Sequence, residues 1–516
     1  MHHKKTKTRQ SMLVALMASA LLAGCADGYD SPSDFDLGVR NTQMKTPDQE
    51  SVSFSVSADG TTATVSWPLV AGASGHEVTF TNVDDPNNPI VVDGYEKKQV
   101  DGSKFTIHVA EDSKYQMTMR TLGNKKLGNT DDPESKSFSF STLVPSVATI
   151  PSGTDITQFI QENPVTYSEN EVAIELEANG EYTMSGPIDF NKQNVTFRGD
   201  KIHRPVVKLV GDGHFETYSG LKLKYINFDL TESTANGVIA MSKDNLPDSI
   251  LSENRGYTRG GNAIKGIYVD SEPIYIGHCW FKNMPHAMLY DNEVSCAFWY
   301  FTVSDCIVQM KNSTKSNIGF INLYKAGKSV KNITIENSTI YNTVDNGSAC
   351  FIRYQNESNS TPEKVFGDKD AISKSHTWKF MNSTLVKCYY DDTTHSGWRF
   401  CNNVRVNTGF FLTIDHSIFY NVSQLYRMNN SGTRSFKFNF FWNDGDDDKK
   451  RNNASKDTNK APFASEYNPQ FKGDISQELD FSQPNGGVDF TPQEYQISSN
   501  RAGDPRWLEP ATPTEQ

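Results

Sequence analysis

A short phrase recurs through the second half of the chain: an apolar strand, a polar residue, a small Ser or Cys, and a second apolar strand. Its five copies are centred on Cys279, Cys306, Ser338, Ser383 and Ser417. The interval between copies varies from 27 residues (Cys279 to Cys306) to 45 residues (Ser338 to Ser383), while the phrase stays the same. A constant corner with connections of variable length is typical of a solenoid, in which each coil contacts only its neighbours.

The repeat predicts an all-β fold, a right-handed parallel β-helix over residues 150–510, with a short capping helix at 152–160. We expect the Ser and Cys column inside the coils, and the cysteines after residue 25 as buried thiols, since no CxxC pair occurs. The polar residue before each small one is expected at a tight turn, with its side chain bonded to the backbone of the next coil. These residues are His278, Asp305, Asn337, Asn382 and His416. A catalytic or metal-binding role for the two histidines is the alternative, disfavoured because Asn occupies the same position twice.

Residues 47–143 have a different pattern, in which apolar and polar residues alternate in short runs between turn residues. This pattern predicts a small β-sandwich ahead of the β-helix. The region resembles a fibronectin type III domain, with Trp67 as the buried core tryptophan and Tyr115 as the corner tyrosine. The resemblance implies a spacer domain.

Residues 1–24 have the pattern of a bacterial lipoprotein signal peptide. A positively charged start precedes an apolar run that is too short to span a bilayer as a mature helix. The run ends in Leu-Leu-Ala-Gly-Cys, which resembles the bacterial lipobox and implies lipidation of Cys25; a plain secretory signal with an incidental cysteine is the alternative. Residues 25–46 are rich in Asp, Ser, Pro and Gly, which predicts a flexible acidic tether.

Acidic residues directly after a lipid-bearing cysteine resemble surface-export signals of glycan-foraging Gram-negative bacteria. The resemblance implies a protein on the surface of the bacterial outer membrane, attached through its lipid alone. The chain has a formal net charge of −12, which argues against nucleic acid as a partner because phosphate binding needs a basic footprint. A local basic groove could still bind an acidic sugar polymer.

A second phrase places an arginine between two large apolar residues, at Arg353, Arg399 and Arg427. Strand alternation puts the apolar residues inside the coil and the arginines outside, stacked about 5 Å apart on successive coils. Three adjacent guanidinium groups repel one another unless an anion lies across them. That anion is either a loop carboxylate of the protein, such as Asp391, or an acidic polymer.

The order of strands and turns in each coil resembles that of pectate lyases and polygalacturonases over roughly residues 150–508, a pectin-lyase-like solenoid. In those enzymes the first strand and the loops before it form the substrate cleft. The opening (154–199) and the end (502–508) of the region closely resemble uncharacterised β-helix lipoproteins of polysaccharide-utilisation systems. The resemblance implies binding of an acidic, pectin-type polysaccharide, with outer-membrane glycan-uptake proteins as candidate partners.

The candidate substrate-binding residues are Arg353, Arg399, Arg427, Lys325, Tyr389 and Tyr390. Hydrolysis of the polygalacturonase type needs paired aspartates and a third acid, and no such set is identifiable. A pectate-type lyase needs a Lys or Arg base and usually Ca²⁺, for which Lys325 or Arg353 and the possible ligand Asp291 are candidates. One acidic ligand is too few for a calcium site. We therefore expect a binding protein, with a calcium-dependent lyase as the first alternative and a structural surface protein as the second.

Overall fold

The computed structural model describes residues 39–57, 60–311, 319–344, 350–355, 360–367, 376–388, 400–402, 404, 410–422, 433–442, 463–464 and 467–510. The chain divides into two compact units, Met1–Leu143 and Val144–Gln516. The expected signal peptide and Cys25 lie outside the described residues. Within the described part of the chain, no helix combines the length and apolar character needed to cross a membrane.

The first unit consists of two small antiparallel sheets. One has the order β1 (Ser53–Val56), β2 (Thr62–Ser66), β6 (Lys104–His108). The other has the order β4 (Ile90–Val91), β3 (Ala73–Asn82), β7 (Lys114–Gly123), β8 (Lys136–Ser141), and β5 (Lys98–Val100) also pairs with β3. Short 3-10 helices cover Gln49–Ser51 (η2) and Lys125–Leu127 (η3).

The two predicted aromatic positions of this unit are buried in its core. Trp67 donates a hydrogen bond from Nε1 to Nε2 of the buried His76 at 2.9 Å. The Tyr115 hydroxyl accepts a hydrogen bond from the backbone N–H of Ala110 at 2.7 Å. Each polar end is thus satisfied while the ring packs inside, as buried Trp and Tyr require.

Residues 41–46, assigned from the sequence to the flexible tether, pack against this unit. Gln43 pairs with Thr130, and the backbone N–H of Thr46 donates to the Asp132 carboxylate at 2.6 Å. Met44 is buried. Residues 41–46 are therefore held in the packed unit by backbone hydrogen bonds and a buried apolar side chain, although their composition is that of a tether.

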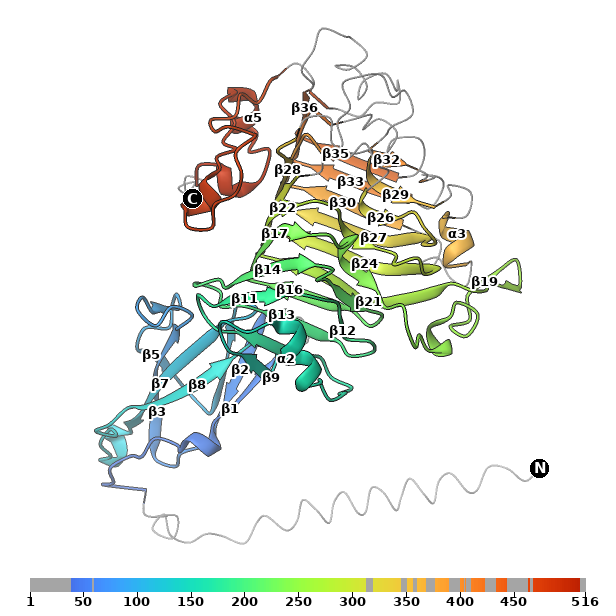
Figure 1. The fold of residues 1–516 in the computed structure, drawn as a ribbon. Helices are drawn as coiled ribbons and strands as arrows, with labels where there is room; N and C mark the ends of the chain where they lie inside the picture. The colour runs from blue at the N-terminus through green and yellow to red at the C-terminus, as the bar shows by residue number, and fades with distance from the viewer. Residues whose placement is uncertain are drawn as a thin grey trace, which may run out of the picture. The chain divides into compact units, whose positions relative to one another are not determined.

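Three long parallel sheets run through the second unit (Figure 1). The strands of the first, sheet I, precede the repeated turn in the sequence of each coil. Sheet I contains β9 (Ser146–Ile150), β10 (Val172–Leu176), β13 (Val195–Arg198), β16 (Leu221–Lys224), β21 (Tyr268–Gly277), β24 (Cys296–Ser304), β27 (Ser329–Glu336), β30 (His376–Met381), β33 (Phe410–Asp415) and β35 (Thr433–Lys437).

Sheet II follows the turn, and the strands of sheet III come after those of sheet II along the chain. Sheet II contains β11 (Glu181–Met184), β14 (Val206–Gly211), β17 (Asn227–Ser233), β22 (Trp280–Met284), β25 (Ile307–Met310), β28 (Thr339–Asn342), β31 (Thr384–Val386), β34 (Ile418–Tyr420), β36 (Asn439–Trp442) and β37 (Phe463–Ala464). Sheet III contains β12 (Ile188–Asp189), β15 (Phe215–Thr217), β18 (Gly237–Met241), β23 (Ala287–Tyr290), β26 (Gly319–Leu323), β29 (Cys350–Tyr354) and β32 (Cys401–Asn402). The predicted parallel β-helix is confirmed, and helix α2 (Ile156–Glu162) follows its first strand.

The predicted column of small residues lies inside the coils, fully buried. It is also a hydrogen-bond ladder, in which backbone N–H groups donate to the hydroxyl at the same position in the next coil: Cys306 to Ser338 at 3.0 Å and Ser338 to Ser383 at 3.4 Å. Ser383 likewise donates to Ser417 at 3.3 Å. The six cysteines from Cys279 onward are buried and unbridged, as predicted.

The turn column differs from the prediction in one respect. All five residues at this position have a φ between 46° and 54°, the left-handed region that Asn, Asp and His tolerate better than most residues. Their backbone N–H groups, rather than their side chains, reach the next coil, as in Asn337 to the carbonyl of Met381 at 3.1 Å. The ring of His278 stacks on Tyr225 at 4.9 Å. Backbone conformation therefore selects the residue types at this turn.

Residues 467–510, here called the C-terminal strap, lie along sheet II (Figure 1). The strap contains η7 (Pro484–Gly487), α5 (Tyr495–Ser499) and η8 (Pro505–Trp507). Its apolar side chains, such as Leu479 and Trp507, share a core with outward residues of sheet II, such as Ile307 and Tyr341. The strap therefore seals one face of the β-helix.

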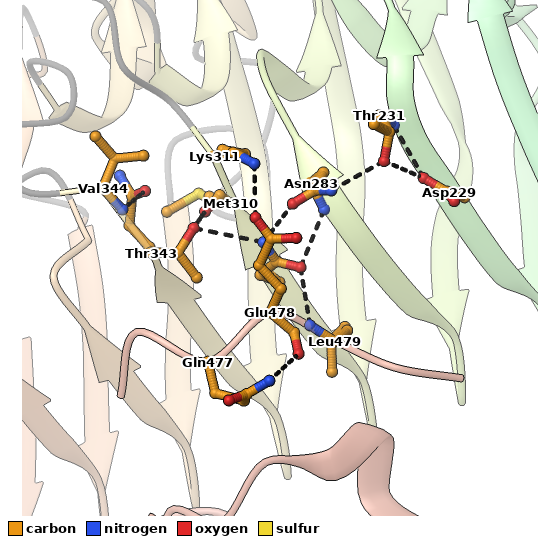
Figure 2. Close-up of polar contacts among 12 residues, drawn as sticks. Asp229, Thr231, Asn283, Met310, Lys311, Thr343, Val344, Gln477, Glu478 and Leu479 are labelled. Atoms are coloured by element: carbon orange, nitrogen blue, oxygen red, sulfur yellow. Dashed lines mark hydrogen bonds and ion pairs between the residues drawn. The ribbon is translucent and has the colours of Figure 1, made fainter. Parts of the chain in front are cut away.

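Polar contacts fix the position of the strap (Figure 2). The fully buried Gln309 side chain accepts hydrogen bonds from the backbone N–H of Leu479 at 3.1 Å and of Asn283 at 3.2 Å. Its Nε2 donates to the side-chain Oδ1 of Asn283 at 2.6 Å. Glu478 accepts from Lys311 Nζ at 2.6 Å. Buried polar groups that are fully bonded specify one arrangement, so the strap has a defined register on sheet II.

Candidate anion-binding site

An open pocket of about 640 Å³ lies where strands of sheet I begin. Four of its lining side chains are basic: Arg259, Lys265, Lys328 and Lys364. The remaining lining residues are Asn262, Ala263, Ile264, Ile267 and Ser295, so none of the described lining residues is acidic. We call this site the basic pocket.

Arg259 is held at the tip of a hairpin formed by β19 (Thr258–Arg259) and β20 (Asn262–Ala263). Gly260 and Gly261 have φ of 56° and 79°, the backbone conformation that a two-residue hairpin turn requires. The hairpin belongs to a long connection between β18 and β21, which also contains η4 (Asp248–Ile250). The tight turn therefore projects Arg259 from the coil at the pocket.

Lys364 comes from a different connection, which leads to β30, three strands away from β21 in sheet I. It lies on α3 (Pro362–Val365). After this helix Gly367 packs so closely on the hairpin that a Cβ atom would lie 2.3 Å from the Thr258 carbonyl oxygen, and its φ is +76°. Glycine at 367 thus allows the two connections to meet and brings distant cations to one site.

An apolar satellite core supports the pocket from below. It includes Tyr257, which precedes the hairpin, Phe366, which follows α3, and Ile267, which precedes β21. The Tyr257 and Phe366 rings lie edge to face, with their centroids 6.3 Å apart. Ile267 lines the pocket and belongs to this core. The basic side chains therefore stand on a packed base, which limits the rearrangement needed to bind a ligand.

The four cations of the basic pocket have no ion pair within 4.0 Å to a carboxylate of the described residues. Lys328 donates to the neutral Gln355 side chain at 3.0 Å, and Gln355 donates onward to the Lys325 carbonyl at 2.8 Å. The pKa of Glu253 is held below its usual range, mainly by backbone N–H groups and in small part by Lys265. The positive charge of the four basic side chains is therefore available to an external anion.

Arg353, predicted as one of three arginines in an exposed strip, is only 4% exposed. Its neighbours Ile352 and Tyr354 belong to the interior core, as alternation predicts, so Arg353 lies on the outer side of the strand. Its guanidinium carbon lies 3.3 Å from the centroid of the Tyr324 ring. Burial lowers the pKa of Arg353 because it disfavours the charged form. A covered side chain is not part of an open strip.

The strand register also differs from the predicted stacking. Arg353 on β29 is paired with Asn402 on β32, and Ile352 with Cys401. The prediction paired Arg353 with Arg399, three residues earlier. Alternation within a strand fixes which side a residue faces, but only the pairing with the next coil fixes its neighbour.

Lys325 and Asp291, the other candidates in the described chain, lie close together but make different contacts. Lys325 is exposed and lies 3.7 Å from the equally exposed Glu293 carboxylate. Asp291 is fully buried, and its carboxylate accepts hydrogen bonds from the backbone N–H groups of Ala326, Gly327 and Glu293 at 2.8–3.1 Å. Burial raises the pKa of Asp291. Its oxygens hold a turn of the backbone, which gives Asp291 a structural role.

Tyr389, Tyr390, Arg399 and Arg427 lie outside the described residues. Within the described ranges, no group of three His, Cys, Asp or Glu side chains is arranged to hold a metal ion. The predicted site residues that the structure describes are thus Arg353, which is buried, Lys325, which is on the surface, and Asp291, which has a structural role.

The basic pocket was missed because its cations are isolated in sequence. Arg259 and Lys364 are more than a hundred residues apart, and neither belongs to a repeated phrase. The run Arg-Gly-Gly-Asn at 259–262 is a hairpin signal that could have identified the projecting turn. The approach of the two connections has no comparable signal.

Two family models match the chain, and both describe domains of unknown function: DUF4992 over residues 2–181 and DUF4957 over residues 180–343. The chain matches none of the curated proteins with which it was compared. A solved structure of a mutant of the PL6 family alginate lyase AlyGC is similar over 61% of this chain, at 12% sequence identity and a TM-score of 0.33. The match covers 43% of the lyase chain, less than half of its length.

Proposed function

We propose that this protein binds an acidic polysaccharide of the uronate class in the basic pocket, and that it does so as a lipid-anchored protein on the bacterial outer membrane. The observation that carries the proposal is the convergence of Arg259, Lys265, Lys328 and Lys364 on one pocket whose described lining contains no acidic residue. These four cations lie together in one pocket although the formal net charge of the chain is −12.

The chemistry of the pocket suits a uronate polymer. Arginine and lysine form charge-assisted hydrogen bonds with carboxylates, and a uronan presents a carboxylate on every sugar. The pocket volume of about 640 Å³ lies in the usual range for ligand sites, so it has room for more than one cation to contact the ligand. The lipobox at Cys25 and the acidic residues after it support the surface location.

Affinity electrophoresis of the full-length protein through gels containing polygalacturonate tests the proposal. We expect retardation by polygalacturonate that falls with added salt, and none by neutral dextran. The double variant Arg259→Gln/Lys364→Gln should lose at least about tenfold in affinity, equivalent to about 1.4 kcal/mol. The side chains are exposed or half-buried, so folding should be unaffected.

Lys208→Gln is the matched control, because it removes one exposed cation from β14 of the same β-helix without touching the pocket. Equal retardation of the double variant and the wild type would exclude the basic pocket as the binding site. Unsaturated uronate products in the same incubations, with or without Ca²⁺, would replace the binding function with a lyase activity.

A further inference from the structure

A second pocket, of about 370 Å³, lies at the N-terminal end of the β-helix beside α2. One part of its wall is apolar, formed by Ile160, Pro164, Val165 and Pro187. Its polar lining residues include Thr157, Gln161, Asp189, Asn191 and Lys192. A mainly apolar wall with a few polar groups is the usual composition of a small-molecule site, and the volume is at the small end of that class.

Tyr167 lines this pocket with its ring half exposed, at 50% of the side chain surface. The ammonium group of Lys192 lies 3.8 Å from the centroid of that ring, which is a cation–π contact. The contact orients the ring and places a positive charge at the pocket. Lys192 has no carboxylate within 4.0 Å among the described residues.

Asp189 supplies the opposite charge and a fixed acceptor. Its Oδ1 accepts hydrogen bonds from Ser242 Oγ at 2.7 Å and from the backbone N–H of Asn191 at 2.8 Å. No residue of the described chain donates a hydrogen bond to Oδ2. The carboxylate is therefore oriented by one oxygen and retains the other for a ligand hydroxyl.

We propose that this pocket binds a single uronate residue, in the pyranose form, as a subsite separate from the basic pocket. The apolar face of the sugar packs on Tyr167, its carboxylate pairs with Lys192, and a hydroxyl donates to Asp189. The two charges of the pocket lie on different lining residues, which matches a ligand with a carboxylate at one position and hydroxyl groups at others. This site has its own residues, and it stands whether or not the basic pocket binds polymer.

Saturation-transfer NMR and calorimetry with free galacturonic acid on the full-length protein test this proposal. We expect saturation of the sugar ring protons in the wild type and its loss in Tyr167→Ala. Lys192→Gln should weaken galacturonate binding by about threefold to tenfold, because one partly exposed charge pair is removed. Galactose, which lacks the carboxylate, should bind the wild type and Lys192→Gln equally weakly.

Two controls separate this proposal from the function proposed above. Tyr495→Ala removes a tyrosine that is 73% exposed on α5 and should change nothing. Arg259→Gln/Lys364→Gln should weaken polygalacturonate binding. In that background galacturonic acid should still bind, and adding Tyr167→Ala should remove this binding. The proposal is overturned by three results: no transfer to galacturonic acid, undiminished transfer in Tyr167→Ala, or equal affinity of the wild type for galactose and galacturonate.

Discussion

Two regions of the β-helix differ in whether their cations have carboxylate partners. One is the C-terminal strap with the face of sheet II that it covers, and the other is the basic pocket. Under the strap, each of two cations has a carboxylate partner, Lys311 with Glu478 and Arg506 with Asp504, both at 2.6 Å. In the basic pocket, four cations have none among the described residues. A paired cation stabilises the fold, whereas a group of unpaired cations has electrostatic repulsion that a bound anion would relieve.

The largest effect should come from the sealed face. Trp507 is buried between the strap and sheet II, and its Nε1 donates to Thr339 Oγ1 at 2.7 Å. Trp507→Ala should destabilise the β-helix by about 3–5 kcal/mol, because it removes a large buried ring and leaves a cavity. Denaturant unfolding of the full-length protein measures the change. Trp507→Phe keeps much of the packing and should cost less; equal costs for the two would contradict a packing role.

The next effect is a dependence of stability on pH at the same face. Burial raises the pKa of Asp504 to about 6, although Arg506 opposes the shift. The folded state then holds a proton on Asp504 that the unfolded state has released, so stability falls as pH rises from about 4 to about 6, by at most about 1.4 kcal/mol per pH unit. Above pH 6 this contribution is constant.

Asp504→Asn isolates this contribution from that of other buried acids such as Asp270, whose pKa burial raises to about 7. The wild type should lose more stability between pH 4 and pH 6 than Asp504→Asn does, in denaturant unfolding at each pH. Parallel stability curves for the two proteins would show that Asp504 does not titrate in this window.

The smallest effect belongs to Lys325, the predicted base of the lyase hypothesis. Lys325→Gln breaks an exposed ion pair with Glu293, which should cost between zero and about 1 kcal/mol. Its effect on polygalacturonate binding should be smaller than that of the double variant of the basic pocket. A loss of binding as large as that of the double variant would move the site toward sheet III and weaken the contrast between paired and unpaired cations.

Much of the fold was predictable because its signals are local and repeated. The Ser and Cys column recurs in every copy of the phrase, so Ser338 and Ser383 could be placed inside the coils before any coordinates. The capping helix expected at 152–160 is α2, which begins after Asp155, whose side chain accepts a hydrogen bond from the N–H of Gln158 at 3.2 Å. N-cap chemistry depends on neighbouring residues alone.

The candidate site was much less predictable, because it depends on contacts between coils. Strand alternation correctly predicted that Arg353 is on the outer side of its strand. It did not predict the Tyr324 ring that lies against the guanidinium, because that ring comes from another part of the chain. The stacking of Arg353 on Arg399 needed the register, which nothing in the repeated phrase determines. The strap carries no repeat at all, so its packing on sheet II could not be anticipated.

The contact of Gly367 with Thr258 has a consequence for how this protein can change. The two connections that bear Arg259 and Lys364 lead into β21 and β30, and these strands are separated by β24 and β27, at about 4.8 Å per strand. Adding or deleting one whole coil between them would leave a continuous solenoid yet separate or crowd the hairpin and α3. The basic pocket therefore requires a fixed number of coils between the two connections. Duplication of a coil can lengthen the solenoid and keep the pocket only if the new coil is added outside this interval.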